Sequence, residues 1–501
     1  MSFLYIAPYI IPLCNFFLQS YPRIFNRLFG VDVWTRLLEI DHIRKNKHKI
    51  PQKKLTGQFI IEGYFDYPPI FPTLLSYIPK KNLLLLQGFI APFIDSLQVI
   101  MVYIVAYYIT NNIGIALLAQ GIYMLTPMIA IENSYLTPRS LGYLNFSLAT
   151  FPLLFYYYNG DIWFYFAGVI FTSLLFLTHR FAIQSFFFIT LFFSFFLNTG
   201  IFVQSFILGF AIALIVTKGY YLRVLKGHLY NIYFWVKNLD HRFSHQIRGK
   251  ITKDTKTDFV NIIYTLLSVF SPIAIFGLNP WALSGFIIAY IFIFHLVTLP
   301  TIFIGFSAWI IFFYFLGVIV LKTKYLMPIG EGQRYMEMST VPSAILSSYI
   351  FFECLKTPHK TLAFIVLIFL LVSNLSLILF IQIKGVIKDK NRSVTDDLMK
   401  VFRFINKQKN IPRIICIPHQ NTTMTIYHTK ACVFVNADNP GLMSVQEVYP
   451  ILKVSLKDLV KKYKLTHALV KESFVTLEEL HLIEKNVVFK SGDVKLVKLN
   501  S

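Results

Sequence analysis

An acidic residue near the start of the chain is the strongest candidate for chemistry. Asp32 follows the first apolar run, and Trp34 and Arg36 stand close to it in the sequence. A carboxylate just outside a membrane can act as a general base or orient an acceptor hydroxyl. In a helix that begins near Asp32, Arg36 and Glu39 would share its face. A helix cap or a solvated charge is the alternative interpretation of Asp32.

Further acids could line a polar cavity with Asp32. They are Asp66, Asp95, Glu132 and Glu337. Asp66 stands, with Glu62, just before the Tyr67-Pro68-Pro69 segment, where prolines disfavour helix and predict a rigid turn. Asp95 lies within an apolar run, and ionisable groups inside a membrane face a polar cavity or pair with another helix. Glu132 could bind a metal or lie in a solvated turn.

Cationic side chains at junctions between apolar runs are further candidates. Arg139 and Arg334, which precedes Tyr335, could bind a phosphate, and His179 could be a ligand or a proton donor. A guanidinium presents a planar fork of donors that fits a phosphate. Each junction also has a plainer interpretation. Arg139 could lie in a solvated turn, and His179 could be an interfacial anchor. Arg334 could form an intrahelical pair with Glu337.

The composition indicates a polytopic membrane protein. Of the 501 residues, 55% are hydrophobic and 14% are charged, and the mean hydropathy is +0.58. Soluble domains carry about 25% charged residues. The net charge of +22 comes largely from basic residues beside apolar runs, where they suit anionic lipid headgroups, so we expect no nucleic acid partner. The four cysteines show neither a metal-binding spacing nor a disulfide framework. No P-loop, GxSxG, HExxH or Rossmann motif is present.

Apolar runs long enough to cross a bilayer define the fold class. Backbone groups have no water partner in lipid, so such runs must be helical. We predict a mainly α protein, a polytopic transmembrane helical bundle of about 12 spans, with a small C-terminal α/β soluble domain. The spans are predicted near 3–19, 82–108, 113–131, 141–158, 162–178, 181–198, 201–217, 259–277, 282–298, 300–321, 341–356 and 361–384. The domain boundaries are 1–384 and 385–501.

Two long basic loops interrupt the transmembrane domain. The second of them, 218–258, mixes Lys and Arg with aromatic residues, which suggests a helix in the membrane interface or a solvated basic loop. The span count places it on the same side as the first loop, 20–81, and the positive-inside rule would make that side cytoplasmic. Twelve spans put 385–501 on the opposite side, whereas a missed or re-entrant span would reverse this.

The C-terminal segment has an α/β pattern without a catalytic constellation. Strands are predicted at Arg413–Ile417, Ala431–Val435 and His467–Val470, with a hairpin of Val487–Phe489 and Val494–Leu499. Helices are predicted at Ser455–Tyr463 and after the capping box that begins at Thr476. This domain therefore supports or recognises rather than reacts.

Together, these motifs resemble the first-loop pattern of polytopic GT-C-type glycosyltransferases, which use polyprenyl-phosphate- or polyprenyl-pyrophosphate-linked sugar donors. In that pattern an Asp follows the first span, and an interfacial helix and a Tyr-Pro-Pro turn lead into the second. The matching segments are Asp32–Leu37, Tyr67–Phe71, Thr137–Ser140, Thr178–Arg180 and Glu331–Glu337. The resemblance covers roughly residues 1–360 and rests on short motifs.

The resemblance implies a membrane glycosyltransferase, a hexosyl- or pentosyltransferase of cell-envelope polysaccharide biosynthesis, with a lipid, glycan or protein acceptor. Asp32 would be the catalytic base for inverting transfer, or would help to bind metal in the oligosaccharyltransferase branch. A divalent cation, Mg or Mn, is left open as a cofactor. Arg139, His179 and Arg334 would contact the lipid phosphate. Some relatives have His where this chain has Arg36, which suits a phosphate better than a metal. The active site would face the exoplasm at the plasma membrane.

Two other functions fit the same residues. A transporter or flippase of lipid-linked polysaccharide precursors would use Asp95, Glu132 and Arg139 as a polar path. Inverted repeats would favour it, and the sequence shows none. A non-catalytic scaffold of an envelope-assembly complex would tolerate replacement of Asp32, Arg139 and Arg334 with no loss beyond stability.

Overall fold

The computed structural model describes residues 2–54, 57–131, 133, 135–242, 244–249, 276–434 and 445–499. The chain forms two compact units. The first unit comprises Met1–Phe25, Gly88–Tyr221 and Lys256–Ile387. The second comprises Asn26–Gln87, Leu222–Thr255 and Lys388–Ser501. Both long basic loops thus share a unit with the C-terminal segment, and a domain boundary at residue 384 stays a prediction of the sequence.

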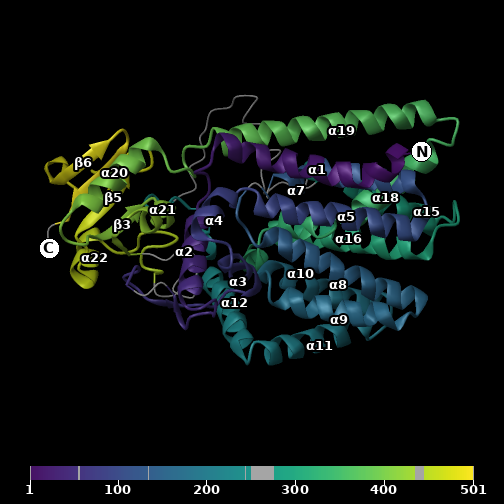
Figure 1. Ribbon diagram of the computed structural model, residues 1–501, viewed down its shortest axis with the longest axis horizontal. Helices are drawn as coiled ribbons and strands as arrows, with labels where there is room; N and C mark the ends of the chain where they lie inside the picture. The colour runs from purple at the N-terminus through teal and green to yellow at the C-terminus, as the bar shows by residue number, and fades with distance from the viewer. Residues whose placement is uncertain are drawn as a thin grey trace. The chain divides into compact units, whose positions relative to one another are not determined.

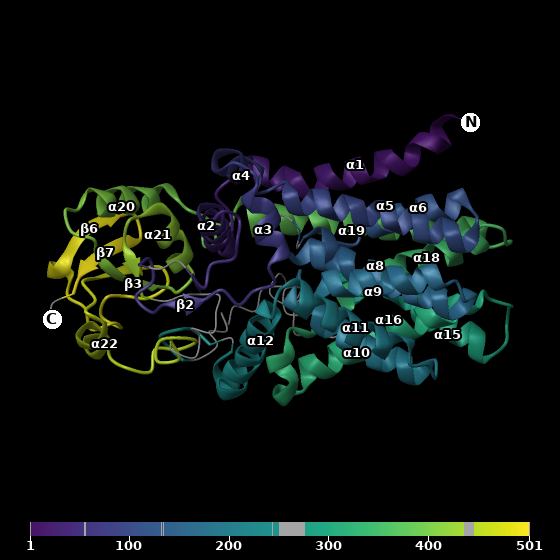
Figure 2. The same cartoon turned by 60° about the horizontal axis from the view of Figure 1, so that its bottom comes forward.

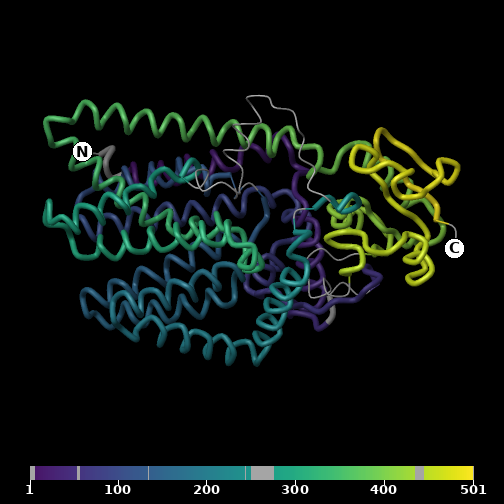
Figure 3. Tube along the Cα trace, turned by 180° about the vertical axis from the view of Figure 1, so that it is seen from behind, coloured from purple at the N-terminus to yellow at the C-terminus, as the bar shows by residue number. Residues whose placement is uncertain are grey.

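The first unit is helical throughout its described residues, and its long helices run side by side (Figure 1, Figure 3). Its elements are α1 Ser2–Phe25, α5 Ile90–Thr110, α6 Ile113–Met124, α7 Pro127–Ala130, α8 Arg139–Asn159, α9 Ile162–Phe176, α10 Arg180–Phe196, α11 Ile201–Val216, η2 Pro280–Ala282, α15 Leu283–Ile293, α16 Thr301–Lys322, η3 Lys324–Ile329, α17 Gly332–Glu337, α18 Thr340–Cys354, α19 Lys360–Gln382 and the π-helical turn η4 Ile383–Ile387. The predicted span 259–277 falls mostly outside the described residues.

Two predicted spans are interrupted by identifiable residues. The run predicted as 82–108 breaks at Gly88, where a Cβ atom would lie 2.7 Å from the side chain of Arg23. The run predicted as 113–131 breaks at Thr126, which is extended because the residue before a proline disfavours helix. Proline chemistry therefore divides the second of these apolar runs, which hydropathy alone joins.

The predicted count of about 12 spans is not confirmed. Among the described residues, three helices are long and apolar enough to cross a membrane: α5, α16 and Lys360–Ile387. The bent pair of α11 and α12 would add a fourth if it were one span. Helices such as α9 and α15, with 15 and 11 residues, fall short of the ~20 residues that a bilayer core requires.

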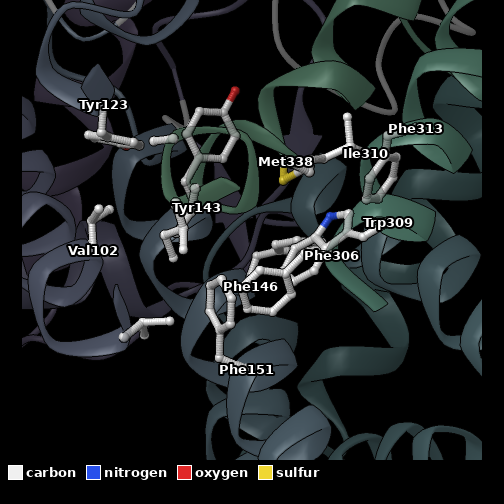
Figure 4. Packing of buried hydrophobic residues seen from close by; sticks show 14 of the residues in the cluster. Val102, Tyr123, Tyr143, Phe146, Phe151, Phe306, Trp309, Ile310, Phe313 and Met338 are labelled. Carbon is white, nitrogen blue, oxygen red and sulfur yellow. The ribbon is translucent and has the colours of Figure 1, made fainter. Parts of the chain in front are cut away.

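Small residues and aromatic rings pack the first unit. Gly209 of α11 faces Thr172 of α9, and the Thr172 hydroxyl lies 3.1 Å from that of Ser205. Small residues let membrane helices approach closely, since lipid provides no hydrophobic drive between them. The indole of Trp309 is fully buried, with ring centroids 5.8 Å from Phe146 and 5.1 Å from Phe151 (Figure 4).

The second unit is a mixed α/β assembly. Its elements are α2 Asp32–Lys45, β1 Lys53–Lys54, β2 Gly63–Tyr64, α3 Ile70–Ser76, α4 Lys80–Leu86, α12 Tyr220–Lys237 (whose first two residues belong to the first unit), η1 Leu239–His241, α20 Asp396–Lys407, β3 Arg413–Ile417, α21 Asn421–His428, β4 Cys432–Val433, α22 Leu456–Tyr463, β5 His467–Lys471, η6 Glu484–Asn486, β6 Val487–Ser491 and β7 Val494–Lys498. The helix predicted within 218–258 is thus confirmed as α12. The Tyr-Pro-Pro segment leads into the short helix α3, so helix replaces the predicted turn from Ile70 onward.

A five-stranded sheet organises the C-terminal part of this unit, in the order β4-β3-β5-β7-β6. β3 pairs in parallel with β4 and β5, whereas β7 is antiparallel to β5 and β6. α20 and α21 cover one face and α22 the other (Figure 2). The predicted strands and hairpin are confirmed. The prediction of a helix after Thr476 is wrong. The capping-box bonds between Thr476 and Glu479 do form. They close only a turn, which ends at His481, where φ is 54°.

The three chain segments that form the second unit bear on the membrane topology. Asn26–Gln87, Leu222–Thr255 and Lys388–Ser501 pack together, and a bilayer cannot divide one packed unit. We expect the whole unit to lie on one side of the membrane. The C-terminal segment is then expected on the same side as the first loop, the placement that a missed or re-entrant span gives.

Substitution of Gly209 by Ala is expected to destabilise the α9–α11 contact. The new Cβ would lie 2.5 Å from Thr172 Cγ2, and overpacking of this kind costs about 1–3 kcal/mol. Thermal unfolding in detergent measures the loss. Gly121→Ala in α6 is the matched control, because no atom lies within 4 Å of its new Cβ. Equal melting temperatures for the two variants would contradict the packing account.

Single cysteines at Lys47, Asp240 and Lys461 are expected to react with a membrane-impermeant maleimide from the same side of sealed vesicles. All three positions are exposed and belong to the second unit. Labelling of Lys461→Cys from the opposite side would disprove the placement of the whole unit on one side of the membrane.

The labelling background replaces Cys14, Cys354 and Cys432 by Ser. Cys416 can stay, because burial raises the pKa of its thiol to about 12 and leaves little reactive thiolate.

Candidate active site

The candidate base, Asp32, is the first residue of α2. Its side chain is exposed. Val31, rather than Asp32, occupies the N-cap position of the helix. An acid in the first turn is favoured by the positive end of the helix dipole. The local sequence thus explains why the helix begins here, and it leaves the carboxylate accessible.

The helix α21 holds the start of α2. The hydroxyl of Thr423 donates a hydrogen bond of 2.6 Å to the carbonyl of Val31, the residue before Asp32. Trp34 is fully buried, and its ring centroid lies 5.1 Å from Tyr427 and 4.6 Å from His428. Burial lowers the pKa of His428 to about 4, so the ring is neutral at pH 7 and packs as an aromatic group.

A short backbone ladder fixes the segment that precedes Asp32. The Gly30 amide donates to the Arg392 carbonyl at 2.7 Å, and the Val394 amide donates to the Leu28 carbonyl at 3.1 Å. The Asn26 side-chain amide donates to the Ser393 hydroxyl at 2.8 Å. Asp32 is therefore held in position by α21 and by the residues that follow the last long helix, α19.

Arg36 lies in a buried cluster one turn after Asp32. Its guanidinium contacts the Glu39 carboxylate at 2.9 Å and lies 4.1 Å from the ring centroid of Tyr67. The predicted shared face is correct for Arg36 and Glu39, which are buried together. The charge of Arg36 is thereby balanced within its own helix and stacked on the Tyr-Pro-Pro segment.

Asp66 is buried, whereas the neighbouring Glu62 is exposed. Asp66 packs against Gly227 of α12, where an added Cβ would lie 2.0 Å from the Asp66 carboxylate. Glycine at this position lets the helix approach the acid.

In the first unit, Arg139 and Glu337 form a buried ion pair with a separation of 3.9 Å. Arg139 begins α8 and Glu337 ends α17, so each charge stands at the helix end whose partial charge has the same sign. The pair offsets two unfavourable helix-end charges, and it places a guanidinium at a helix N-terminus, which is a suitable place for an anion.

His179 caps the helix α10. Its Nδ1 atom accepts a hydrogen bond of 3.3 Å from the Ala182 amide. Its Cβ packs against Gly142 of α8, where a side chain would approach within 2.5 Å.

The predicted pairing of Arg334 with Glu337 is wrong. Arg334 Nε contacts Glu331 at 2.9 Å, one turn in the other direction, because Glu337 faces Arg139. Tyr335 is fully buried, and its hydroxyl donates to the Ile329 carbonyl at 2.9 Å and contacts Gln184. Glu331 as the partner of Arg334 was missed at the sequence level.

Asp95 joins three helices. Its carboxylate accepts hydrogen bonds from Asn15 at 3.0 Å, Gln19 at 2.6 Å and Tyr123 at 2.9 Å. These contacts link α1, α5 and α6, in line with the helix-pairing interpretation. Glu132 lies outside the described residues.

The candidates fall into separate groups. Asp32, Arg36 and Asp66 belong to the second unit, and Arg139, His179, Arg334, Tyr335, Asp95 and Glu337 belong to the first. Trp34 was noted only as a neighbour of Asp32, and the partners on α21 carry no sequence signal. Within the described parts of the chain, no three His, Cys, Asp or Glu side chains come close enough to hold a metal ion. A divalent cation, Mg or Mn, therefore stays a prediction of the sequence.

No protein-family model matches the sequence, and no curated protein matches it. Solved structures do match. The archaeal oligosaccharyltransferase AglB from Archaeoglobus fulgidus, in complex with an inhibitory peptide and a dolichol-phosphate, has a TM-score of 0.60 at 11% identity, covering 100% of this chain and 74% of that one. The structure of the Archaeoglobus fulgidus oligosaccharyltransferase in complex with Zn and sulfate has a TM-score of 0.59 at 12% identity. The match covers 92% of this chain and 68% of that one.

A bacterial structure also matches over nearly the whole of both chains. ArnT from Cupriavidus metallidurans, bound to undecaprenyl phosphate, has a TM-score of 0.52 at 12% identity, covering 98% of this chain and 97% of that one. These neighbours are GT-C glycosyltransferases. The resemblance read from the motifs is thus confirmed at the level of the fold.

Replacement of Thr423 by Val is expected to loosen the start of α2. The variant removes the donor to the Val31 carbonyl, and one such bond is worth about 0.5–1.5 kcal/mol. Faster hydrogen exchange over residues 26–35 measures the effect. Thr429→Val is the control, because its hydroxyl bonds within α21, to the Thr425 carbonyl. Equal exchange in the two variants would show that Thr423 does not hold this segment.

Proposed function

We propose that this protein is an integral membrane glycosyltransferase that takes a sugar from a polyprenyl-phosphate- or polyprenyl-pyrophosphate-linked donor. The acceptor class is a lipid, a glycan or a protein. The main support is the fold, which matches AglB and ArnT over nearly the whole chain. The solved structures of those two proteins hold a dolichol-phosphate and undecaprenyl phosphate, respectively. A fold alone does not fix an activity, so the proposed activity also depends on the roles of the candidate residues.

Asp32 is the proposed base. Its carboxylate accepts the proton of an acceptor hydroxyl while the hydroxyl oxygen bonds to the anomeric carbon of the sugar. The bond between that carbon and the donor phosphate breaks, and the phosphate leaves with the electron pair. Attack from the face opposite the leaving group inverts the anomeric centre. An exposed acid at a helix start, held by Thr423 and Trp34, suits this role, because general bases must be held in position to act.

Cationic side chains are proposed to stabilise the leaving phosphate. Arg139 is one candidate, since it stands at a helix N-terminus, where its guanidinium lies 3.9 Å from the buried carboxylate of Glu337. His179 and Arg334 are the further candidates of the first unit. Positive groups aimed at a developing negative charge lower the barrier most where water is excluded. The described residues assign no step to a metal ion.

The proposed setting is the plasma membrane, with the reaction on the exoplasmic face. Lipid-linked sugars keep their polyprenyl chain in the bilayer, so the transfer must occur at the membrane surface. The first loop and the C-terminal segment would both lie on that side, because they pack in one unit.

Substitution of Asp32 by Asn is expected to lower turnover about 10²–10⁴-fold, the usual contribution of a general base, with little change in the melting temperature. The assay measures transfer of labelled sugar from a panel of polyprenyl-phosphate sugars in proteoliposomes. Asp458→Asn in α22 is the control, since it removes another exposed acid of the same unit. Unchanged turnover in Asp32→Asn would mean that the base is another residue.

A further inference from the structure

The helix α12 (Tyr220–Lys237) has two apolar faces rather than one. Its inner face carries Val224 and Phe234, which are buried, and Phe234 joins the core of the C-terminal part. The outer face carries Leu222, Leu229, Tyr233 and Val236, whose exposed fractions run from 47% to 56%. These four positions recur at helical spacing and form one stripe. A soluble surface helix would place polar residues there.

Lysines border this outer stripe. Lys226 lies 5.6 Å from the ring centroid of Tyr230, and Lys237 lies 4.6 Å from that of Tyr233. Both lysines and Tyr230 are exposed. Tyrosine and lysine have apolar stems and polar tips, so they suit a boundary between apolar and aqueous surroundings. The outer face therefore combines apolar area with positive charge at its edge.

The chain enters α12 directly from an apolar helix. α11 (Ile201–Val216) contains no charged residue, and the connection Thr217–Gly219 brings in Lys218. Lys218 and Gly219 have φ angles of 50° and 80°, and the Thr217 hydroxyl accepts a hydrogen bond of 3.2 Å from the Tyr221 amide. A cation at the end of an uncharged apolar helix marks a membrane boundary. The junction between α11 and α12 therefore has the sequence that is typical of a membrane boundary.

We propose that the outer stripe of α12 lies in the headgroup region of an anionic bilayer, with Lys226 and Lys237 on lipid phosphates. Opposite charge favours this occupant, because basic amphipathic helices bind anionic lipid surfaces. A second copy of the chain would bring the same lysines against one another, which Coulomb repulsion opposes. The inference is independent of the proposed sugar transfer.

The anchored helix would also fix the rest of its unit. The inner face packs Phe234 into the C-terminal core, and Gly227 lies against Asp66 of the first loop. A contact of the outer face with lipid would therefore hold both the first loop and the C-terminal segment at the membrane surface.

Spin labels in nanodiscs of phosphatidylglycerol test the position of the stripe. Labels at Leu229→Cys and Tyr233→Cys, in the background that retains only Cys416, are expected to collide with oxygen more than with a water-soluble nickel chelate. A label at Lys461→Cys in α22 is the aqueous control and is expected to show the reverse. Nickel access at Leu229 and Tyr233 equal to that at Lys461 would overturn the proposal. Low access to both reagents in particles that hold two copies would overturn it in favour of a dimer contact.

Charge reversal tests the lipid phosphates. The double variant Lys226→Glu and Lys237→Glu is expected to retain less phosphatidylglycerol than the parent in native mass spectrometry, roughly fivefold per lysine. The control reverses two exposed lysines of α22, Lys457→Glu and Lys461→Glu, and is expected to retain the parental amount. Equal retention in both double variants would overturn the assignment of the two lysines. Melting temperatures confirm that the variants fold.

Discussion

The packing of Trp34 between α2 and α21 is the contact on which the candidate site depends. A carboxylate in a long loop samples many positions, and a misplacement of about 1 Å can cost a hundredfold in rate. The ring contacts of Trp34 with Tyr427 and His428, and the bond from Thr423 to Val31, remove that freedom. The acid comes from the first loop, whereas the support comes from residues almost four hundred positions later. The C-terminal segment thus helps to position the proposed base.

The helical unit meets a different demand, which is to keep polar groups satisfied away from water. Asp95 does this with three neutral donors from neighbouring helices. Arg139 and Glu337 do it with each other, at a distance that is long for a buried pair. Buried ion pairs contribute little net stability. Such a pair at two helix ends therefore adds little to stability, whereas the proposed function gives its guanidinium a role.

The helix α12 has one face that suits a soluble core and one face that suits a membrane interface. Its inner face is part of a soluble core, and its outer face has the composition of an interfacial helix. Gly227 makes this possible at one point, because any side chain there would collide with Asp66. The proposed function requires a soluble unit held close to the bilayer, and a helix with two apolar faces suits that connection.

The sequence by itself determined most of the local structure. Apolar runs located nearly all the long helices, because lipid leaves the backbone no alternative, and β-branched runs located β3, β5 and the final hairpin. It also singled out Asp32 and Arg36. The tertiary structure decided the rest. Breaks at Gly88 and Thr126, the turn after Thr476 and the partners of Arg334 and Trp34 depend on residues distant in the chain or on competing local bonds. The grouping of the C-terminal segment with the first loop was likewise decided by packing, since counting spans gives only a parity that one missed or re-entrant helix reverses.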